Sequence, residues 1–416
     1  MQTLSGLGLD LFDPATIARP HPFYARLREE APIIWSEQLR GWVLTRFEDV
    51  RAVLRDTEGY SSMREPVLMG RRDLPIENVA PLGTLTMLAA DRPDHTRLRK
   101  LLAIDFTPRR IVRMQPRIDA ITRELLAAVT DAEPFDVAES LAVPLPVTII
   151  AELLGVPPAL GRQFKAWSDA ATEPIRPDAT EAEVLERNAR IVAFREYMKE
   201  QIDRRHREPT DDFIGRLVAA HDDDSKLSDD ELLAAVNLLL LAGNETTTNL
   251  ISNAVLALTK FPDQEAILRQ DPAWLDNAVE EFLRYDGSVQ FTTRRALADA
   301  TFHGQRVAAG DTVVVVLASA NRDPRAFDTP DELDVRRDIQ RHLGFGDWIH
   351  ICLGQFLARM ETKAAIAGLL DVFPRLALAI PEQDIVYRAN FNLRGPKHLP
   401  ILVGGVRPRA PLDHAV

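Results

Sequence analysis

Apolar residues recur at spacings of three and four through the middle of the chain, from residue 95 to about 285. This is the period of helices that pack on one side. A shorter stretch near the start has the same spacing. The segments predicted to be helical are PFYARLREEA (22–31), RLRKLLAIDF (97–106), RIDAITRELLAAV (117–129), PVTIIAELLGV (146–156) and ARIVAFREYMKEQIDRRH (189–206).

A further predicted helix, residues 227–262, is apolar around most of its circumference. Ser228 stands before it as an N-cap, acids fill its first turn, and Pro262 marks where it stops. A helix without a continuous polar face has to be surrounded by protein. We therefore expect it to run through the centre of the molecule.

Short β-type segments lie towards both ends of the chain. The candidates are PIIW (32–35), GWVLT (41–45), ATFHG (300–304), DTVVVVLASA (311–320), DIVYRANFNLRG (384–395) and LPILVGG (399–405). Residues 61–94 show no sustained period, which predicts a long irregular segment. The predicted fold class is mainly α with a smaller β portion. Because no linker-like tract divides the chain, we expect a single domain over residues 1–416.

Composition excludes several classes of protein. With 46% hydrophobic and 27% charged residues, the chain has the balance of a globular protein with a large core. A formal charge of −12 argues against a nucleic-acid binder, which usually carries a basic face. Neither a signal peptide nor a run of about 18 apolar residues is visible, so no membrane anchor is expected. The single cysteine excludes an internal disulfide and fits a reducing, cytoplasmic compartment.

That cysteine, Cys352, stands before a helical pattern. The apolar residues at helical spacing after it are Leu353, Phe356, Leu357, Met360 and Ala364. Unpaired amides in the first turn of a helix stabilise a thiolate, which predicts a lowered pKa for this thiol. A lone cysteine is otherwise most simply a small buried hydrophobic residue.

The stretch FGDWIHICLG (345–354) resembles the cysteine loop of the cytochrome P-450 superfamily, F-G-x-G-x-H-x-C-x-G. The matching residues are Phe345, Gly346, His350, Cys352 and Gly354. The resemblance implies that Cys352 is the thiolate ligand of a haem b iron, a ligand that favours O–O bond cleavage. It also implies that Gly354 makes room for the ring, and that the haem lies between the central helix and the cysteine-loop helix. It covers about residues 20–405.

One position of the loop departs from the family, because Trp348 replaces the second glycine. That glycine usually serves a tight turn. Either the turn is shifted, or Trp348 adopts a backbone conformation normally left to glycine.

Within the central helix, AGNETT (242–247) is similar to the family's A-G-x-[DE]-T-T. The resemblance implies that Ala242 and Gly243 lie over the haem, that Thr246 hydrogen-bonds the bound oxygen, and that Glu245 relays protons. Gly243 costs about 1 kcal/mol against alanine inside a helix, so a kink or widened turn is expected. An ordinary polar helix face is the alternative, which the apolar surroundings disfavour.

The motif E-x-x-R occurs as Glu281 and Arg284, and ELDVRRDIQRHLGFG adds Arg337. Two such residues three apart are by default a surface pair worth about 0.2–0.5 kcal/mol. The family resemblance implies instead a buried, structural triad that holds the segment before the cysteine loop.

Haem carries two propionates that need cationic or hydrogen-bonding partners. His95 and Arg99 match the family's H-x-x-x-R, Arg294 stands at another propionate position, and His350 completes the set. Arg295 is the alternative to Arg294 if the register slips by one residue.

Substrate contacts are predicted by position within the family pattern. The candidates for a mostly apolar pocket are Leu238, Leu241, Val289, Phe291 and Phe391, each of which could equally be core. Arg64, Arg71 and Arg72 could bind a carboxylate but are more simply solvated loop charges.

The resemblance implies a monooxygenase that inserts one oxygen atom from O2 into a hydrophobic organic substrate. Because no nucleotide-binding fingerprint occurs, electrons have to come from another protein, and an acidic ferredoxin or flavodoxin is expected. The basic residues expected on the cysteine side are Arg97, Lys100, Arg109, Arg110, Arg359 and Lys363. A peroxide-using peroxygenase is the nearer alternative, which the acid–alcohol pair disfavours, and a non-catalytic haem or ligand-binding protein is the more distant one.

Overall fold

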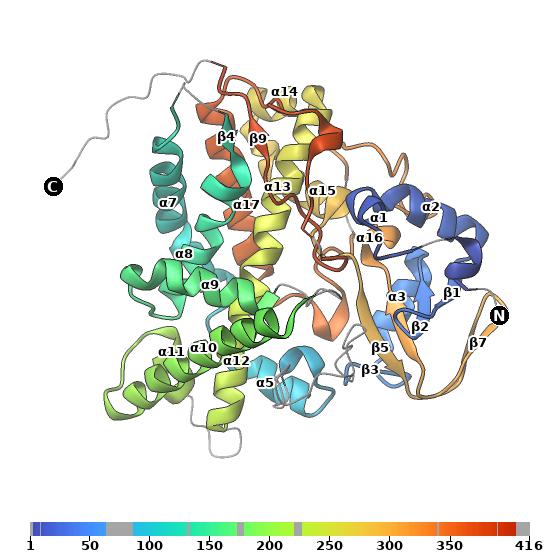
Figure 1. The fold of residues 1–416 in the computed structure, drawn as a ribbon, viewed down its shortest axis with the longest axis horizontal. Helices are drawn as coiled ribbons and strands as arrows, with labels where there is room; N and C mark the ends of the chain where they lie inside the picture. The colour runs from blue at the N-terminus through green and yellow to red at the C-terminus, as the bar shows by residue number, and fades with distance from the viewer. Residues whose placement is uncertain are drawn as a thin grey trace.

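Helices fill most of the molecule, and a small mixed sheet lies at one side of them (Figure 1). The computed structural model describes residues 3–8, 10–63, 86–130, 134–172, 179–219, 227–338, 341–388 and 390–404. The mainly α fold class predicted from the sequence is confirmed.

The helices agree with the apolar pattern, although the helix predicted at residues 189–206 begins earlier, at Glu181. They are α1 (Pro14–Ala18), α2 (Pro20–Glu30), α3 (Phe47–Arg55), α5 (Asp94–Leu102), α6 (Pro108–Ile111), α7 (Gln115–Ala127), α8 (Pro144–Leu153), α9 (Gly161–Thr172), α10 (Glu181–Arg207), α11 (Phe213–Ala219), α12 (Asp229–Gly243), α13 (Glu245–Lys260), α14 (Pro262–Gln270), α15 (Leu275–Asp286), α16 (Leu317–Ala320) and α17 (Gln355–Val372). A π-helical turn, η4 (Ala138–Ala142), precedes α8. Among the described helices, none combines the length and the apolar character needed to cross a membrane.

The predicted central helix is divided into two helices, α12 and α13. Ser228 caps α12 as expected, since its hydroxyl accepts from the Glu231 amide at 3.1 Å and the Glu231 carboxylate accepts in return from the Ser228 amide. The division lies at Asn244, whose φ of −93° and ψ of −72° leave the helical values. The predicted kink is therefore present, one residue beyond Gly243.

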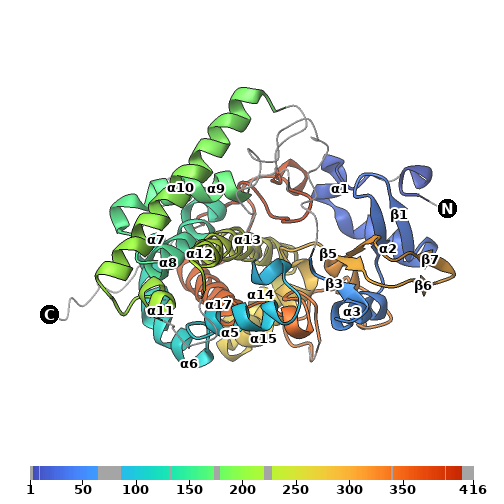
Figure 2. The same ribbon diagram turned by 90° about the horizontal axis from the view of Figure 1, so that it is seen from below.

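α13 is the centre of the helical region. Its residues from Thr247 to Leu258 are all buried, and it packs against α15 and α17, beside which it lies in Figure 1. Burial on every side explains why this segment carries no continuous polar face. In Figure 2 the long helix α10 runs along the outside of the same region.

The main sheet joins strands from distant parts of the chain. Its order is β1 (Ile33–Ser36), β2 (Gly41–Leu44), β8 (Thr312–Val315), β5 (Thr292–Ala296) and β3 (Tyr60–Ser61). β2 and β8 run parallel, and the other neighbours are antiparallel. Two further pairs join β4 (Phe135–Asp136) to β9 (Pro400–Ile401) and β6 (Ala300–Phe302) to β7 (Gln305–Val307).

Two strand predictions are wrong. Residues 384–395 form no strand among the described residues but only isolated bridges, because the Asn390 side chain accepts from the amides of Asn392 and Leu393 and turns the chain. The segment 311–320 is a strand only as far as Val315, after which Leu317 begins the short helix α16.

Candidate functional site

The cysteine loop, residues 345–354, is closed by its own backbone. The Cys352 amide donates to the Phe345 carbonyl oxygen at 2.8 Å. Gly354 is the N-cap of α17, so the thiol lies three residues before the first helical residue. A β-carbon built on Gly354 would meet nothing within 4 Å. The backbone next to the thiol therefore borders open space, as a flat ring would require.

The electrostatic environment of Cys352 differs from the prediction. Burial raises the pKa of the Cys352 thiol, and it outweighs the hydrogen bond from the Gly354 amide and the charges of Arg99 and Arg359, which act to lower it. The expected lowered pKa is wrong for the thiol by itself. The same three groups would stabilise the negative sulfur of a metal-bound thiolate.

Trp348 takes the conformation normally left to glycine. Its φ is +59°, in the left-handed region, which costs about 1–2 kcal/mol for a residue with a β-carbon. The Asp347 carboxylate accepts from the Trp348 amide at 2.7 Å, and Arg55 of α3 donates to the same carboxylate at 2.8 Å. The Arg55 guanidinium also lies 5.5 Å from the centre of the indole ring. Of the two alternatives for this turn, the strained backbone is the correct one.

Phe356, predicted to pack with its helical neighbours, is 38% exposed. It lies in the first turn of α17, on the cysteine side. Leu357, by contrast, is buried in the main core.

The predicted propionate partners gather in one place. His95 and Arg99 lie one turn apart on α5, and the rings of His95 and His350 are 4.2 Å apart. His95 is buried, yet neither ring nitrogen has a hydrogen-bond partner. Burial lowers the pKa of His95, and the positive charges of Arg99 and Arg294 lower it further.

The two candidate arginines for the second propionate position, Arg294 and Arg295, differ in burial. Both lie on β5, where the Arg294 side chain is buried and that of Arg295 faces solvent. The Arg294 guanidinium donates to the Thr293 carbonyl at 2.9 Å. Alternation along the strand thus decides between the two alternatives.

Two residues that sequence reasoning missed support this cluster. The Ser62 hydroxyl is 2.9 Å from His350 Nε2, and the Ser62 amide donates to the Asp91 carboxylate at 2.8 Å. Asp91 also accepts from the Ser61 hydroxyl. No periodic signal marks these positions, since they lie at the edge of the irregular segment.

Ala242 and Thr246 leave part of the central helix accessible, although the residues that follow are buried. The Thr246 hydroxyl donates to the Ala242 carbonyl at 2.7 Å, one turn back. Gly243 has a different role from the predicted one, because a β-carbon there would lie 2.7 Å from Cδ1 of Ile150 on α8. Its small size serves the approach of two helices, whereas Ala242 borders the open face.

Two carboxyl groups lie buried along α13. Glu245, in its first turn, is 8% exposed. Glu361 of α17, which the sequence analysis did not single out, is 1% exposed, and burial raises its pKa to about 8 despite a hydrogen bond with Thr247. Glu361 is therefore protonated near neutral pH.

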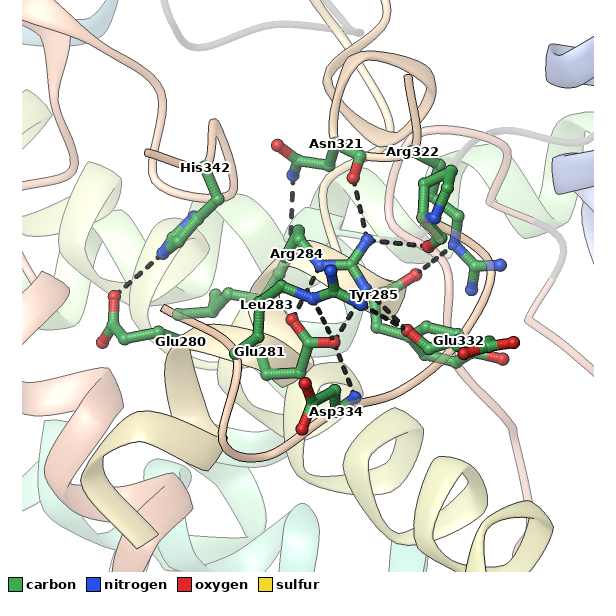
Figure 3. A network of polar contacts seen from close by, with 12 residues as sticks. Glu280, Glu281, Leu283, Arg284, Tyr285, Asn321, Arg322, Glu332, Asp334 and His342 are labelled. Atoms are coloured by element: carbon green, nitrogen blue, oxygen red, sulfur yellow. Dashed lines mark hydrogen bonds and ion pairs between the residues drawn. The ribbon is translucent and has the colours of Figure 1, made fainter. Parts of the chain in front are cut away.

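The E-x-x-R pair, Glu281 and Arg284, lies in a buried network (Figure 3), which Arg337 joins through Glu281. Arg284 donates to both Glu281 oxygens at 2.7 Å, and Arg337 Nε donates to one of them at 3.2 Å. The remaining donors of Arg284 reach backbone carbonyls of Asn321, Pro330 and Glu332. Both side chains of the E-x-x-R pair are fully buried. The network ties α15 to the segment that leads to the cysteine loop.

The predicted pocket residues lie in mixed surroundings. Phe291 and Phe391 stack with ring centres 5.0 Å apart, and Phe12 lies 4.4 Å from Phe391, so these residues belong to a core cluster near the N-terminal helices. Leu238 is buried on α12, and Val289 is partly buried beside the sheet. The side chain of Leu241, like the loop positions Arg64, Arg71 and Arg72, lies outside what the structure describes.

Most of the predicted basic patch is paired with acids. Arg97 binds Glu231, Arg110 binds Asp105, Arg359 binds Glu280, and Lys363 binds Asp276. Lys100 and Arg109 remain exposed, and Arg113 near the end of α6 joins them. These three form no ion pair within the described part of the chain. We call them the basic triplet.

The donor set fits a haem. Buried polar groups in proteins are normally paired, so the two partnerless nitrogens of His95 indicate a ligand with acceptor atoms. Within the described part of the chain Arg99 likewise has no hydrogen bond, and burial lowers its pKa. Together with the open space at Gly354, these groups suit a flat, dianionic molecule beside a thiol.

Comparison with known proteins agrees with this reading. A model of the family "Cytochrome P450", here written cytochrome P-450, matches residues 173–385. The vitamin D(3) 25-hydroxylase of Pseudonocardia autotrophica is 40% identical over 95% of this chain and 96% of its own length, and the monooxygenase PikC of Streptomyces venezuelae is 40% identical over 96% and 93%. The structure of PksS from Bacillus subtilis superposes with a TM-score of 0.85 at 35% identity, covering 95% of this chain and 99% of that one.

Proposed function

The chain belongs to the cytochrome P-450 family, and we propose that Cys352 is the residue through which it binds its haem iron. The protein is a haem-dependent monooxygenase of small organic substrates. When bound, the haem activates O2 so that one oxygen atom enters the substrate. The observation that carries the assignment of Cys352 is a half-buried thiol beside open space at Gly354, within reach of two positive charges.

The propionates are assigned to the cluster of His95, Arg99, Arg294 and His350. Two features of the cluster support this assignment. Among the described residues, neither ring nitrogen of His95 has a hydrogen-bond partner, and the guanidinium of Arg99 has none either. Ser62 positions His350 by a hydrogen bond to Nε2. The roles of the cluster are to bind the carboxylates and to exclude water from that edge of the ring.

Proton handling is assigned to Glu245 and Thr246. Glu245 holds a buried carboxyl group in the first turn of α13, next to Thr246. The Thr246 hydroxyl is accessible and donates only to a backbone carbonyl in its own helix. It can rotate to donate to bound oxygen instead, with the acid replacing the proton. A peroxygenase would not need this pair, which is why we favour O2 over peroxide as the oxidant.

Residues 1–416 are proposed to form one domain. Support comes from the main sheet, in which β2 of the first 50 residues pairs with β8 near residue 315. The substrate is proposed to be hydrophobic, since Leu238 and Val289 offer apolar surface and the described candidates carry no charge.

The decisive experiment is the spectrum of the reduced protein with carbon monoxide. The wild type should show the red-shifted band of a thiolate ligand, and Cys352→Ala should lose it. Phe356→Ala, an exposed change in the same helix turn, should keep it and serves as the control. A wild-type protein without haem, or a band that survives in Cys352→Ala, would refute the proposal.

The electron donor is proposed to be an acidic ferredoxin or flavodoxin that docks at the basic triplet. Family members of bacteria receive electrons from separate redox proteins, and three exposed cations on a protein of charge −12 suit an acidic partner. Reversing Lys100, Arg109 and Arg113 to Glu should slow reduction by such a partner about 10-fold or more at low salt. The same reversal of Arg190 and Lys199 on α10 should leave the rate unchanged. Equal rates in both variants would exclude the triplet as the docking site.

A further inference from the structure

The helix break at Asn244 is tied to a separate helix by a buried hydrogen bond. The Asn244 side-chain amide donates to the Ser168 hydroxyl of α9 at 2.6 Å, and both residues are buried. Ser168 is 76 positions away in the chain, so the contact depends on how α9 packs. Asparagine is a favoured N-cap residue, yet here its side chain caps neither helix.

The break determines where the acid–alcohol pair stands. Glu245 and Thr246 follow Asn244 directly, and the Thr246 hydroxyl bonds the Ala242 carbonyl on the other side of the break. A change in the angle between α12 and α13 would therefore move this hydroxyl relative to Ala242. A group that fixes the angle between α12 and α13 therefore also fixes the position of the Thr246 hydroxyl.

Each side of the break has its own neighbour. On the α12 side, Gly243 lies against Ile150 of α8. On the α13 side, the Thr248 hydroxyl donates to the Ala142 carbonyl of η4 at 2.9 Å. Between these two contacts, the Asn244 side chain binds α9 through Ser168. Three packed elements thus converge on the break from different parts of the chain.

We propose that Asn244 is a positioning residue which, through its bond to Ser168, couples the placement of α9 to the geometry of Glu245 and Thr246. This inference rests on the proposed function, because it acts through that pair. When α9 is in place, the hydroxyl stands where oxygen can receive its proton. When the Asn244–Ser168 hydrogen bond is lost, a larger share of the O2 is released as hydrogen peroxide. Each hydrogen peroxide molecule takes up two electrons and two protons.

Three variants test the bond without removing the acid or the alcohol. Asn244→Leu keeps the branched shape of the side chain but has no donor, Ser168→Ala removes the acceptor, and Ser168→Thr retains a hydroxyl and should behave like the wild type. Ser252→Ala is the matched control, since its buried hydroxyl bonds the Thr248 carbonyl within α13 and not α9. The double variant Asn244→Leu/Ser168→Ala should behave like either single variant, because both remove the same bond.

Two readouts separate positioning from general damage. In the purified haem protein, supplied with electrons from NADPH through a surrogate ferredoxin and its reductase, the hydrogen peroxide formed per NADPH oxidised should rise about threefold or more in Asn244→Leu and Ser168→Ala. Independently of oxygen chemistry, hydrogen–deuterium exchange should quicken by a similar factor in peptides covering both residues 163–172 and 240–250. Ser168→Thr and Ser252→Ala should stay within twofold of wild type in both readouts.

The outcomes are distinguishable from failure of the proposed function. If the wild type lacks the thiolate spectrum, the function itself fails. If the spectrum is normal but neither peroxide nor exchange changes in Asn244→Leu and Ser168→Ala, only the coupling is refuted. An equal rise of peroxide and exchange in Ser252→Ala and Ser168→Ala would also refute the coupling. Loosening of α13 alone would then explain the effect.

Discussion

Two clusters of charged and polar side chains lie near the cysteine loop, and they differ in how completely they are paired. In the cluster of Glu281, Arg284 and Arg337, the carboxylate and the Arg284 guanidinium are satisfied by each other and by backbone groups. In the cluster of His95, Arg99, Arg294 and His350, the nitrogens of His95 and the guanidinium of Arg99 have no hydrogen-bond partner among the described residues. Both clusters are largely buried.

The difference separates a structural role from a binding role. A buried charge without a partner is costly, so a protein retains it only where something else supplies the opposite charge. The paired cluster stabilises the fold by itself. The open cluster lowers the stability of the protein alone and contributes affinity for an anionic ligand.

Breaking the paired cluster should have the largest effect. Arg284→Leu leaves the Glu281 carboxylate buried without its bidentate partner, which should lower the free energy of unfolding by about 3–5 kcal/mol. Denaturant unfolding followed by circular dichroism measures the loss. Arg295→Leu, on an exposed site, is the control and should change stability by less than about 0.5 kcal/mol. Similar stability of Arg284→Leu and wild type would show that this pairing is not structural.

A second paired cluster, around Asp286, should make the stability of the protein depend on pH. His21 lies beside Asp286, which also binds Arg394 at 2.6 Å, and burial lowers the pKa of His21 from 6.5 to about 4. Because the folded protein holds His21 neutral, its contribution to stability is complete above pH 6.5 and is lost as pH falls towards 4. The loss should reach about 2–3 kcal/mol.

His21→Gln removes this titration. Urea unfolding of both proteins at pH 7.0, 5.5 and 4.5 isolates the His21 contribution as the difference between their pH slopes. Parallel slopes would mean that His21 is charged in the folded protein.

Removing the Arg99 guanidinium from the second cluster should affect binding more than stability. Arg99→Gln removes a desolvated charge, so the free energy of unfolding of the haem-free protein should stay the same or rise slightly. Haem affinity should fall about 10- to 100-fold, since a hydrogen bond to a charged group contributes about 1.5–3 kcal/mol. Titration of the haem-free protein with haemin measures this. A large loss of stability with unchanged affinity would place Arg99 among the structural residues instead.

The smallest expected effect concerns the loop itself. Trp348→Gly relieves the left-handed backbone but loses the Arg55 contact, so stability should change by less than about 1 kcal/mol. Trp348→Ala keeps the strain and loses the contact, and should melt below Trp348→Gly. Thermal unfolding of the two variants compares them directly. An alanine variant more stable than the glycine variant would contradict a strained backbone.

Features encoded within a few residues could be read from the sequence. Ser228 and its partner Glu231 mark the start of α12, and Gly243 signals the break nearby. The cysteine loop and its departure at Trp348 also depend on local sequence.

Features that depend on tertiary contacts could not be predicted from the sequence. The segment around Asn390 was predicted to be a strand from its apolar alternation. That pattern does not show the side-chain hydrogen bonds of Asn390 that turn the chain. The acids that pair with most of the predicted basic patch come from other helices, as Glu280 does for Arg359. Ile150, which explains the small residue at Gly243, is almost a hundred positions away. The raised pKa of Cys352 reflects burial, which no motif reports.

The order of strands in the main sheet has a consequence for synthesis of the protein on the ribosome. β2 ends at Leu44, but its parallel neighbour β8 ends at Val315, and β3 likewise waits for β5. At roughly 5–20 residues per second, the N-terminal strands stay without these partners for on the order of 15–55 seconds after they are made. Chaperones that bind nascent chains therefore have a long interval in which to meet the first sixty residues, whereas α7 to α13 can pair with sequence neighbours as they emerge.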